Sequence, residues 1–182
     1  REEDVFIPLW QRTKMANASG GKLFISIHAN STPKISSAQG FETYLLRPGK
    51  TEDAIGVAQQ ENSVIALEEV SLVNSYYNDE NIILATMAQN AFMKESESLA
   101  ALIQEEMEKY SGMPNRGVKQ AGFHVLVGAS MPNVLVEIGF LSNRREGKML
   151  GQSSYRKNVA QALFSAIVRF KNKYEGTISS DK

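Results

Sequence analysis

Two segments place side chains capable of metal or acid–base chemistry in apolar surroundings. The first is the run 23–30, which ends with His28-Ala29-Asn30 and is bounded by Gly20-Gly21 and by Ser31-Thr32-Pro33. Such a run predicts a strand buried on both faces. Ligands of open α/β sheets bind beyond the carboxyl ends of strands, and a neutral imidazole is a common metal ligand. His28 is therefore a candidate metal ligand, and a hydrogen-bonded core histidine is the ordinary alternative.

The second segment is the run 133–141, in which Glu137 interrupts a series of β-branched and other apolar residues. No Lys or Arg lies within six residues on either side of it. A buried, unpaired carboxylate is costly, so Glu137 needs a hydrogen-bonding partner, a metal or a catalytic task.

The elements that must position these two residues alternate between strand and helix. The patterns predict four strands, over 23–30, 41–47, 123–127 and 134–138. They also predict four helices: one over 8–18, one that begins after Thr51 as its N-cap, one from about 92 to 112 and one from 153 or 154 to 174. This alternation predicts an α/β fold with a mostly parallel twisted sheet and helices on both faces, in a single domain over 1–175. Residues 176–182 form a polar tail that we expect to be disordered. His124 falls inside a predicted strand, where a packed or surface side chain is expected and a place at the site is the minor alternative.

Residues 52–81 are too long and too helical for a simple connection between elements. Their first half repeats small and apolar residues at helical spacing, and their second half is rich in Tyr and Asn. We interpret this segment as an insertion over the face of the sheet that carries the site.

Composition excludes several classes of function. The 182 residues include 20 basic and 20 acidic side chains, so no charge excess indicates a nucleic-acid partner. No apolar run is long enough to span a membrane. The chain has no cysteine and two histidines, so a metal site would use imidazole and carboxylate ligands.

Several segments resemble the zinc-dependent N-acetylmuramoyl-L-alanine amidases of the Amidase_3 family, which cleave the amide between muramic acid and the first alanine of the peptidoglycan stem peptide. The two most specific are Phe24-Ile25-Ser26-Ile27-His28-Ala29-Asn30 and Val136-Glu137-Ile138-Gly139-Phe140-Leu141-Ser142-Asn143. Shorter matching segments are 4–9, Arg12-Thr13, Ala16-Asn17, Gly40-Phe41-Glu42-Thr43-Tyr44 and 116–123.

The resemblance implies a function and a set of roles. It implies Zn²⁺ as cofactor, His28 as a metal ligand and Glu137 as the group that moves the proton. It places Arg116 and Asn30 at the substrate, although a solvated Arg116 is an equal alternative. It also implies peptidoglycan as substrate, with a role in cell-wall degradation and cell division, and the bacterial cell envelope, periplasmic or secreted, as location.

The resemblance also indicates that elements precede Arg1. A first strand, a Gly-rich turn, a helix and most of a second strand of the family pattern have no counterpart here, and these carry the family's other zinc ligands. Because a catalytic zinc needs three protein ligands, the 182 residues alone are expected to bind zinc weakly and to be inactive.

Some amidases of this family carry a blocking helix at the place of the 52–81 insertion, which an activator protein withdraws. By location, the resemblance implies a gate here, with Glu61, Glu68 or Glu69 as the inhibitory carboxylate. An insertion that packs on the sheet and helps to bind glycan is the competing interpretation.

Two other functions stay open at this point. One is an inactive peptidoglycan-binding or regulatory module with the same fold. The other is a zinc carboxypeptidase that acts on the same stem peptides.

Overall fold

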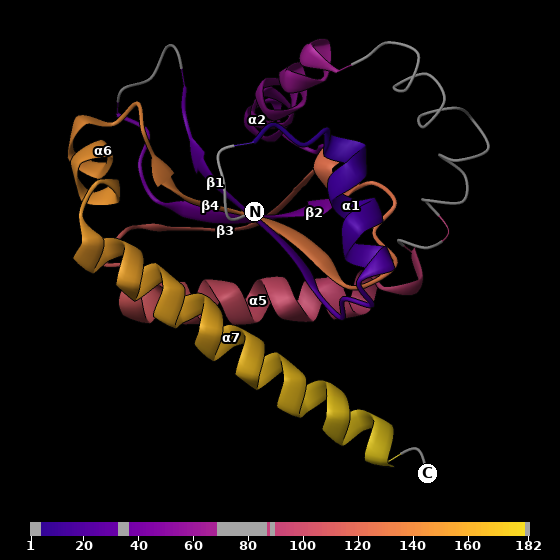
Figure 1. Cartoon of the computed structure of the whole chain (residues 1–182). Helices are drawn as coiled ribbons and strands as arrows, with labels where there is room; N and C mark the ends of the chain where they lie inside the picture. Colours follow the sequence, from indigo (N-terminus) through magenta and orange to yellow (C-terminus); the bar gives the residue numbers. More distant parts are fainter. Residues whose placement is uncertain (1–4, 33–36, 69–86, 88–89, 181–182) are drawn as a thin grey trace. The chain divides into compact units, whose positions relative to one another are not determined.

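The computed structural model describes residues 5–32, 37–68, 87 and 90–180, without the side chains of 177–180 (Figure 1). The chain forms two compact units, which are treated separately below. One comprises residues 1–26, 46–94 and 120–133, and the other comprises 27–45, 95–119 and 134–182. The second unit holds most of the sheet.

The sheet has four strands in the order β1-β4-β2-β3. These are β1 (Phe24–Asn30), β2 (Phe41–Leu46), β3 (Asn115–Ala121) and β4 (Asn133–Phe140). The α/β class is therefore as predicted. Within this mostly parallel sheet, β2 pairs antiparallel with β4.

A buried glutamate joins the loops at one end of the sheet. Glu146 accepts hydrogen bonds from the backbone amides of Gly40 at 2.7 Å and Phe140 at 2.8 Å. Gly40 has φ +107°, and a Cβ there would collide with the carbonyl oxygen of Pro114. Glycine is therefore required just before β2. These contacts hold the start of β2 beside the end of β4.

Two long helices belong to the same unit as most of the sheet. They are α5 (Met93–Tyr110) and α7 (Ser153–Ser180), and the short α6 (Arg144–Leu150) precedes α7. Gln104 of α5 donates to Thr43 Oγ1 of β2 at 2.7 Å. Arg169 of α7 donates to Glu106 of α5 at 2.6 Å, where the two helices cross (Figure 1). The apolar side chains along one face of α5, among them Leu99, Ile103 and Met107, are buried in the core.

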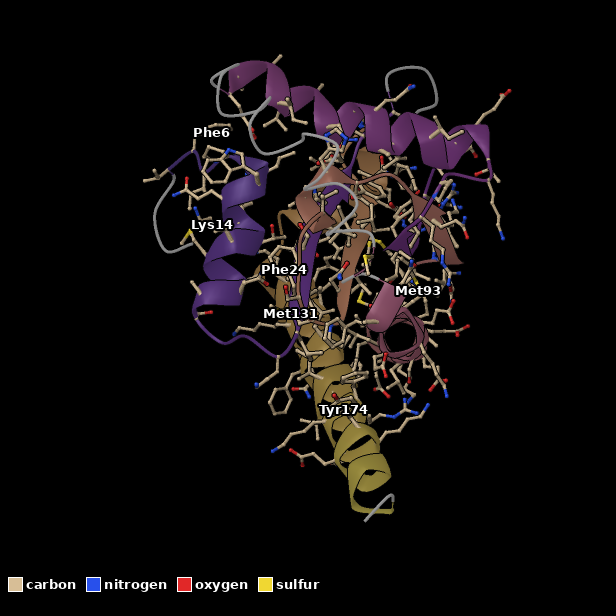
Figure 2. The ribbon with its side chains drawn as sticks, turned by 90° about the vertical axis from the view of Figure 1, so that its right-hand side faces the viewer. Phe6, Lys14, Phe24, Met93, Met131 and Tyr174 are labelled. Atoms are coloured by element: carbon tan, nitrogen blue, oxygen red, sulfur yellow. The ribbon has the colours of Figure 1, made fainter. Side chains whose placement is uncertain are left out.

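The other unit contains α1 (Leu9–Ala18), α2 (Glu52–Asn62) and two 3₁₀ turns, η1 (Ser63–Leu67) and η2 (His124–Leu126). Thr13 of α1 donates to the carbonyl of Val127 at 2.9 Å. The Phe24 amide donates to the carbonyl of Pro132 at 3.0 Å, and Figure 2 shows Met131 beside Phe24. The start of β1 is thus tied to the segment that leads into β4. No described helix has the length and the apolar character needed to cross a membrane.

Several predicted elements are confirmed with shifted ends. Thr51 caps α2 by accepting from the Ala54 amide at 3.3 Å. Pro8 precedes α1 as its N-cap instead of opening it. The insertion is helical through α2 and η1, and its residues 69–81 lie outside the described part of the chain, as do residues 33–36 of the loop after β1.

Three predictions were wrong, and one strand was missed. Residues 123–127 contain the 3₁₀ turn η2 instead of a strand, because the β-branched pattern there is too short to decide. Strand β3 was not predicted, since its sequence NRGVKQA has little apolar character. Helix α7 continues to Ser180, where a disordered tail was expected. Finally, β1 is not buried on both faces, since the side chain of Ile27 is 55% exposed.

Candidate functional site

The side chains of His28 and Glu137 come together within the unit that holds most of the sheet. Successive side chains of a strand point to opposite faces, so His28 and Asn30 share one face of β1. Glu137 comes from the neighbouring strand β4 and is 0% exposed, while His28 is half-buried. A ring nitrogen of His28 and a carboxylate oxygen of Glu137 lie within 4.8 Å of each other. The two residues of the sequence prediction therefore face one site.

A second buried glutamate stands directly opposite Glu137. In the antiparallel pair of β2 and β4, Glu42 is the cross-strand partner of Glu137, and its side chain is 1% exposed. Cross-strand partners have Cβ atoms roughly 5 Å apart on one face of the sheet, and like charges in that position repel. The site therefore needs compensating positive charge.

Four donors surround the carboxylate of Glu42. Its Oε1 accepts from Tyr44 Oη at 2.6 Å and from Asn30 Nδ2 at 3.1 Å. Its Oε2 accepts from Arg116 Nε at 2.7 Å and from Lys119 Nζ at 2.5 Å. All these residues belong to the unit that holds Glu137. Glu42 thus receives the two cations of β3.

These contacts keep Glu42 ionised. Burial raises the pKa of Glu42, but the hydrogen bonds from Lys119, Tyr44 and Arg116 outweigh it and hold the pKa below its usual value. Tyr44 shows the opposite effect, because burial and the negative charge of Glu42 raise the pKa of its hydroxyl far above the ordinary value. Tyr44 therefore stays a hydrogen-bond donor at any physiological pH.

The donor chemistry of the site fits part of a zinc centre. Neutral imidazole nitrogen and carboxylate oxygen are both zinc ligands, and the chain has no thiol that would compete. Of its two histidines, only His28 lies in this unit, because His124 belongs to the other. His28 would hold the metal, and Glu137 is close enough to act on a group bound beside it.

Glu61, Glu68 and His124 belong to the other compact unit. Glu61 is half-buried in the last turn of α2. Glu68 is buried and accepts from the Leu9 amide at 2.6 Å, so it serves the N-terminus of α1, where Pro8 offers no side-chain cap. Glu69 lies outside the described residues. His124 is half-buried in η2. Burial lowers the pKa of its imidazole, and the negative charge of Glu68, which raises the pKa, is the smaller effect.

Sequence reasoning missed Glu42, Tyr44 and Lys119. A signal for Glu42 was present, since it is a carboxylate within a predicted strand, like Glu137. Lys119 offered no such signal, because its strand was not predicted and its partner lies 77 residues away.

Comparison with known proteins places the chain in a family. Residues 1–169 match the Amidase_3 family model, described as N-acetylmuramoyl-L-alanine amidase. The chain belongs to this family. Among curated relatives of the amidase family, AmiC of Neisseria meningitidis serogroup B is 36% identical over 174 residues, which cover 94% of this chain and 41% of that protein. AmiA of Escherichia coli K12 is 30% identical over 93% of this chain and 59% of its own length.

Solved structures agree with this assignment of the amidase fold. The catalytic domain of the amidase CwlV from Bacillus (Paenibacillus) polymyxa var. colistinus has a TM-score of 0.65 and 26% identity, over 94% of this chain and 70% of that one. The chain spans only about half the length of the two curated amidases named above.

Proposed function

We propose that this chain is the catalytic part of a zinc-dependent peptidoglycan hydrolase that cleaves the amide between N-acetylmuramic acid and L-alanine of the stem peptide. The observation that carries the proposal is the convergence of His28 and Glu137 on one face of the sheet in a chain of the amidase family. We also propose the cell envelope, periplasmic or secreted, as the place of action.

In this proposal the two residues have different tasks. His28 supplies one nitrogen ligand to Zn²⁺. When bound, the ion polarises the scissile carbonyl and lowers the pKa of the attacking water. Glu137 takes the proton from that water and returns it to the leaving amine nitrogen. Its burial away from bulk solvent suits this shuttle, because a dry site strengthens each electrostatic interaction within it.

Arg116 and Asn30 contribute to substrate binding in different ways. The side chain of Arg116 is 29% exposed, so its guanidinium can bind a carboxylate of the stem peptide. Asn30 is only 2% exposed and donates to Glu42. We therefore assign Asn30 an indirect role, in which it holds Glu42 in place.

The test of this function uses the natural protein that contains this chain. It should release stem peptides from purified peptidoglycan, lose this activity on treatment with a chelator and regain it with Zn²⁺. Mass spectrometry should show a free N-terminal alanine on the product. Cleavage within the peptide would instead indicate a carboxypeptidase, and binding without cleavage would indicate an inactive peptidoglycan-binding module.

We further propose that the 52–81 insertion gates the site and that an activator protein opens it. Glu68 is engaged by the Leu9 amide, which leaves Glu61 and Glu69 as candidates for the inhibitory ligand, and we test Glu61 first. A closed state favoured by ~3 kcal/mol would hold activity near ~1%, since each 1.4 kcal/mol is a factor of ten.

Replacing residues 52–81 by a short Gly-Ser linker in the natural protein should therefore raise the rate of peptidoglycan hydrolysis by ~10- to 100-fold. Glu61→Gln should raise it in the same direction, because the amide is a poorer metal ligand than the carboxylate. Glu52→Gln, in the first turn of the same helix, is the matched control and should leave the rate unchanged. A folded linker variant with equal or lower activity would refute the gate and favour a glycan-binding role.

A further inference from the structure

The cluster around Glu42 joins one buried carboxylate to two cations of β3. Arg116 and Lys119 both donate to the same oxygen, Oε2, while Tyr44 and Asn30 occupy Oε1. Two full positive charges are thus held on one negative charge. A fully hydrogen-bonded, buried carboxylate has no acceptor capacity left for substrate, so Glu42 itself is not a group that contacts the reacting atoms.

The two cations are less buried than the anion that anchors them. The side chains of Arg116 and Lys119 are 29% and 22% exposed, against 1% for Glu42. Each cation also stands over an aromatic ring, since the guanidinium of Arg116 is 5.2 Å from the ring centre of Phe140 and Lys119 Nζ is 6.0 Å from that of Tyr44. Both are therefore held in place before any ligand arrives, which lowers the entropy cost of binding.

Arg116 keeps its recognition edge available. It donates to Glu42 through Nε, and its two terminal nitrogens have no hydrogen bond to any described residue. A guanidinium can donate two parallel hydrogen bonds to a carboxylate through such nitrogens, and Lys119 can add a point charge beside it.

We propose that Arg116 and Lys119 form a two-cation subsite that selects stem peptides with a free carboxylate near the scissile amide, and that Glu42 is the positioning residue of this subsite. The proposal rests on the proposed hydrolase function and adds Lys119 and Glu42 to it. It makes Lys119 a residue that determines specificity for carboxylate over carboxamide.

A second buried glutamate that receives two cations lies on the helices and can serve as a control for the Glu42 cluster. Glu106 of α5 is also buried, and it also receives two cations, Lys109 and Arg169. That cluster joins α5 to α7 and includes no residue of the strands that carry His28 and Glu137. A substitution there removes a cation from a buried carboxylate without touching the proposed subsite.

The experiment measures hydrolysis by the natural protein of two synthetic muramoyl peptides. They are identical except that the second residue carries a free carboxylate in one and a carboxamide in the other. We expect the natural protein to prefer the carboxylate probe by ~10- to 100-fold in kcat/KM, the range of a charge-assisted hydrogen bond. Lys119→Met should reduce this ratio by ~10-fold, mainly through KM, and Lys119→Arg should restore most of it.

Two further variants distinguish a role of Glu42 in positioning the two cations from a general effect on the stability of the protein. Glu42→Gln should also reduce the ratio, because a neutral amide no longer holds both cations. Lys109→Met, the control at Glu106, should leave the ratio unchanged even if it lowers the melting temperature. Because Glu42 is buried, its variant is interpreted only if it folds, and the Lys119 pair decides the question without it.

The outcomes distinguish this inference from the proposed function. Cleavage of both probes at equal kcat/KM would overturn the subsite and leave the amidase function standing. An equal loss on both probes in Lys119→Met would also overturn it, because it would show a purely structural role. Cleavage of neither probe, with no release of stem peptides from peptidoglycan, would overturn the function and the subsite together.

Discussion

Replacing Glu137 by Gln in the natural protein is expected to lower turnover by ~100- to 10,000-fold, the usual worth of a positioned proton-transfer group. Glutamine has nearly the shape of glutamate but cannot accept the proton of the attacking water. Turnover is measured by the release of stem peptide from purified peptidoglycan. Metal content, measured on the same sample, should be that of the natural protein, because Glu137 is assigned to proton transfer and His28 to the metal.

The zinc content of Glu137→Gln decides between a metal ligand and a proton carrier. Equal loss of zinc and of activity in Glu137→Gln would mean that Glu137 is a ligand and would remove its role as proton carrier. The fold should survive the substitution, because Glu137 lies in β4 between well-packed neighbours such as Val136, which is 0% exposed. Circular dichroism and the melting temperature check this.

His28→Ala is expected to lower zinc affinity by more than ~100-fold and to lower activity with it. Residues that merely orient a metal ligand are already worth ~10- to 100-fold in affinity, so loss of a ligand itself should cost more. The measurement is zinc titration of the metal-free natural protein, followed by the peptidoglycan assay at saturating zinc.

His124→Ala provides the matched control, because the chain has only these two histidines. His124 lies in η2, in the other compact unit, and its backbone amide donates to Asn62 Oδ1 at 2.9 Å. Its replacement should leave zinc affinity unchanged. If His124→Ala instead removed the metal and His28→Ala did not, the assignment of the site to the sheet would be wrong.

Two glutamates that face each other on neighbouring strands have different roles because their partners differ. Glu42 receives two cations, a tyrosine and an amide, which keep it ionised and leave it no acceptor capacity. Glu137 stands beside His28 instead. The sequence environments of the two are similar, since each glutamate interrupts an apolar strand, so local sequence alone does not separate the two roles.

The amino-acid sequence by itself determined the features that depend on local periodicity and on local motifs. It predicted the strands of His28 and Glu137, because burial imposes a regular pattern on nearby residues, and it predicted the helix cap at Thr51, because a threonine side chain can accept from the first backbone amides of a helix. It also identified the amidase family, since the segments around His28 and Glu137 each carry a specific motif.

Only the tertiary structure decided the contacts between distant residues. Strand β3 is polar, so its pairing and the approach of Lys119 to Glu42 across 77 residues could not be read from periodicity. The antiparallel register that sets Glu42 opposite Glu137 is likewise a property of the pairing of strands, not of either strand alone. The role of Glu68 could not be read from the sequence either. The sequence offered it as a metal-binding carboxylate, but in the structure it accepts a hydrogen bond from the Leu9 amide at the start of α1. The residue before that helix is Pro8, whose side chain has no acceptor atom.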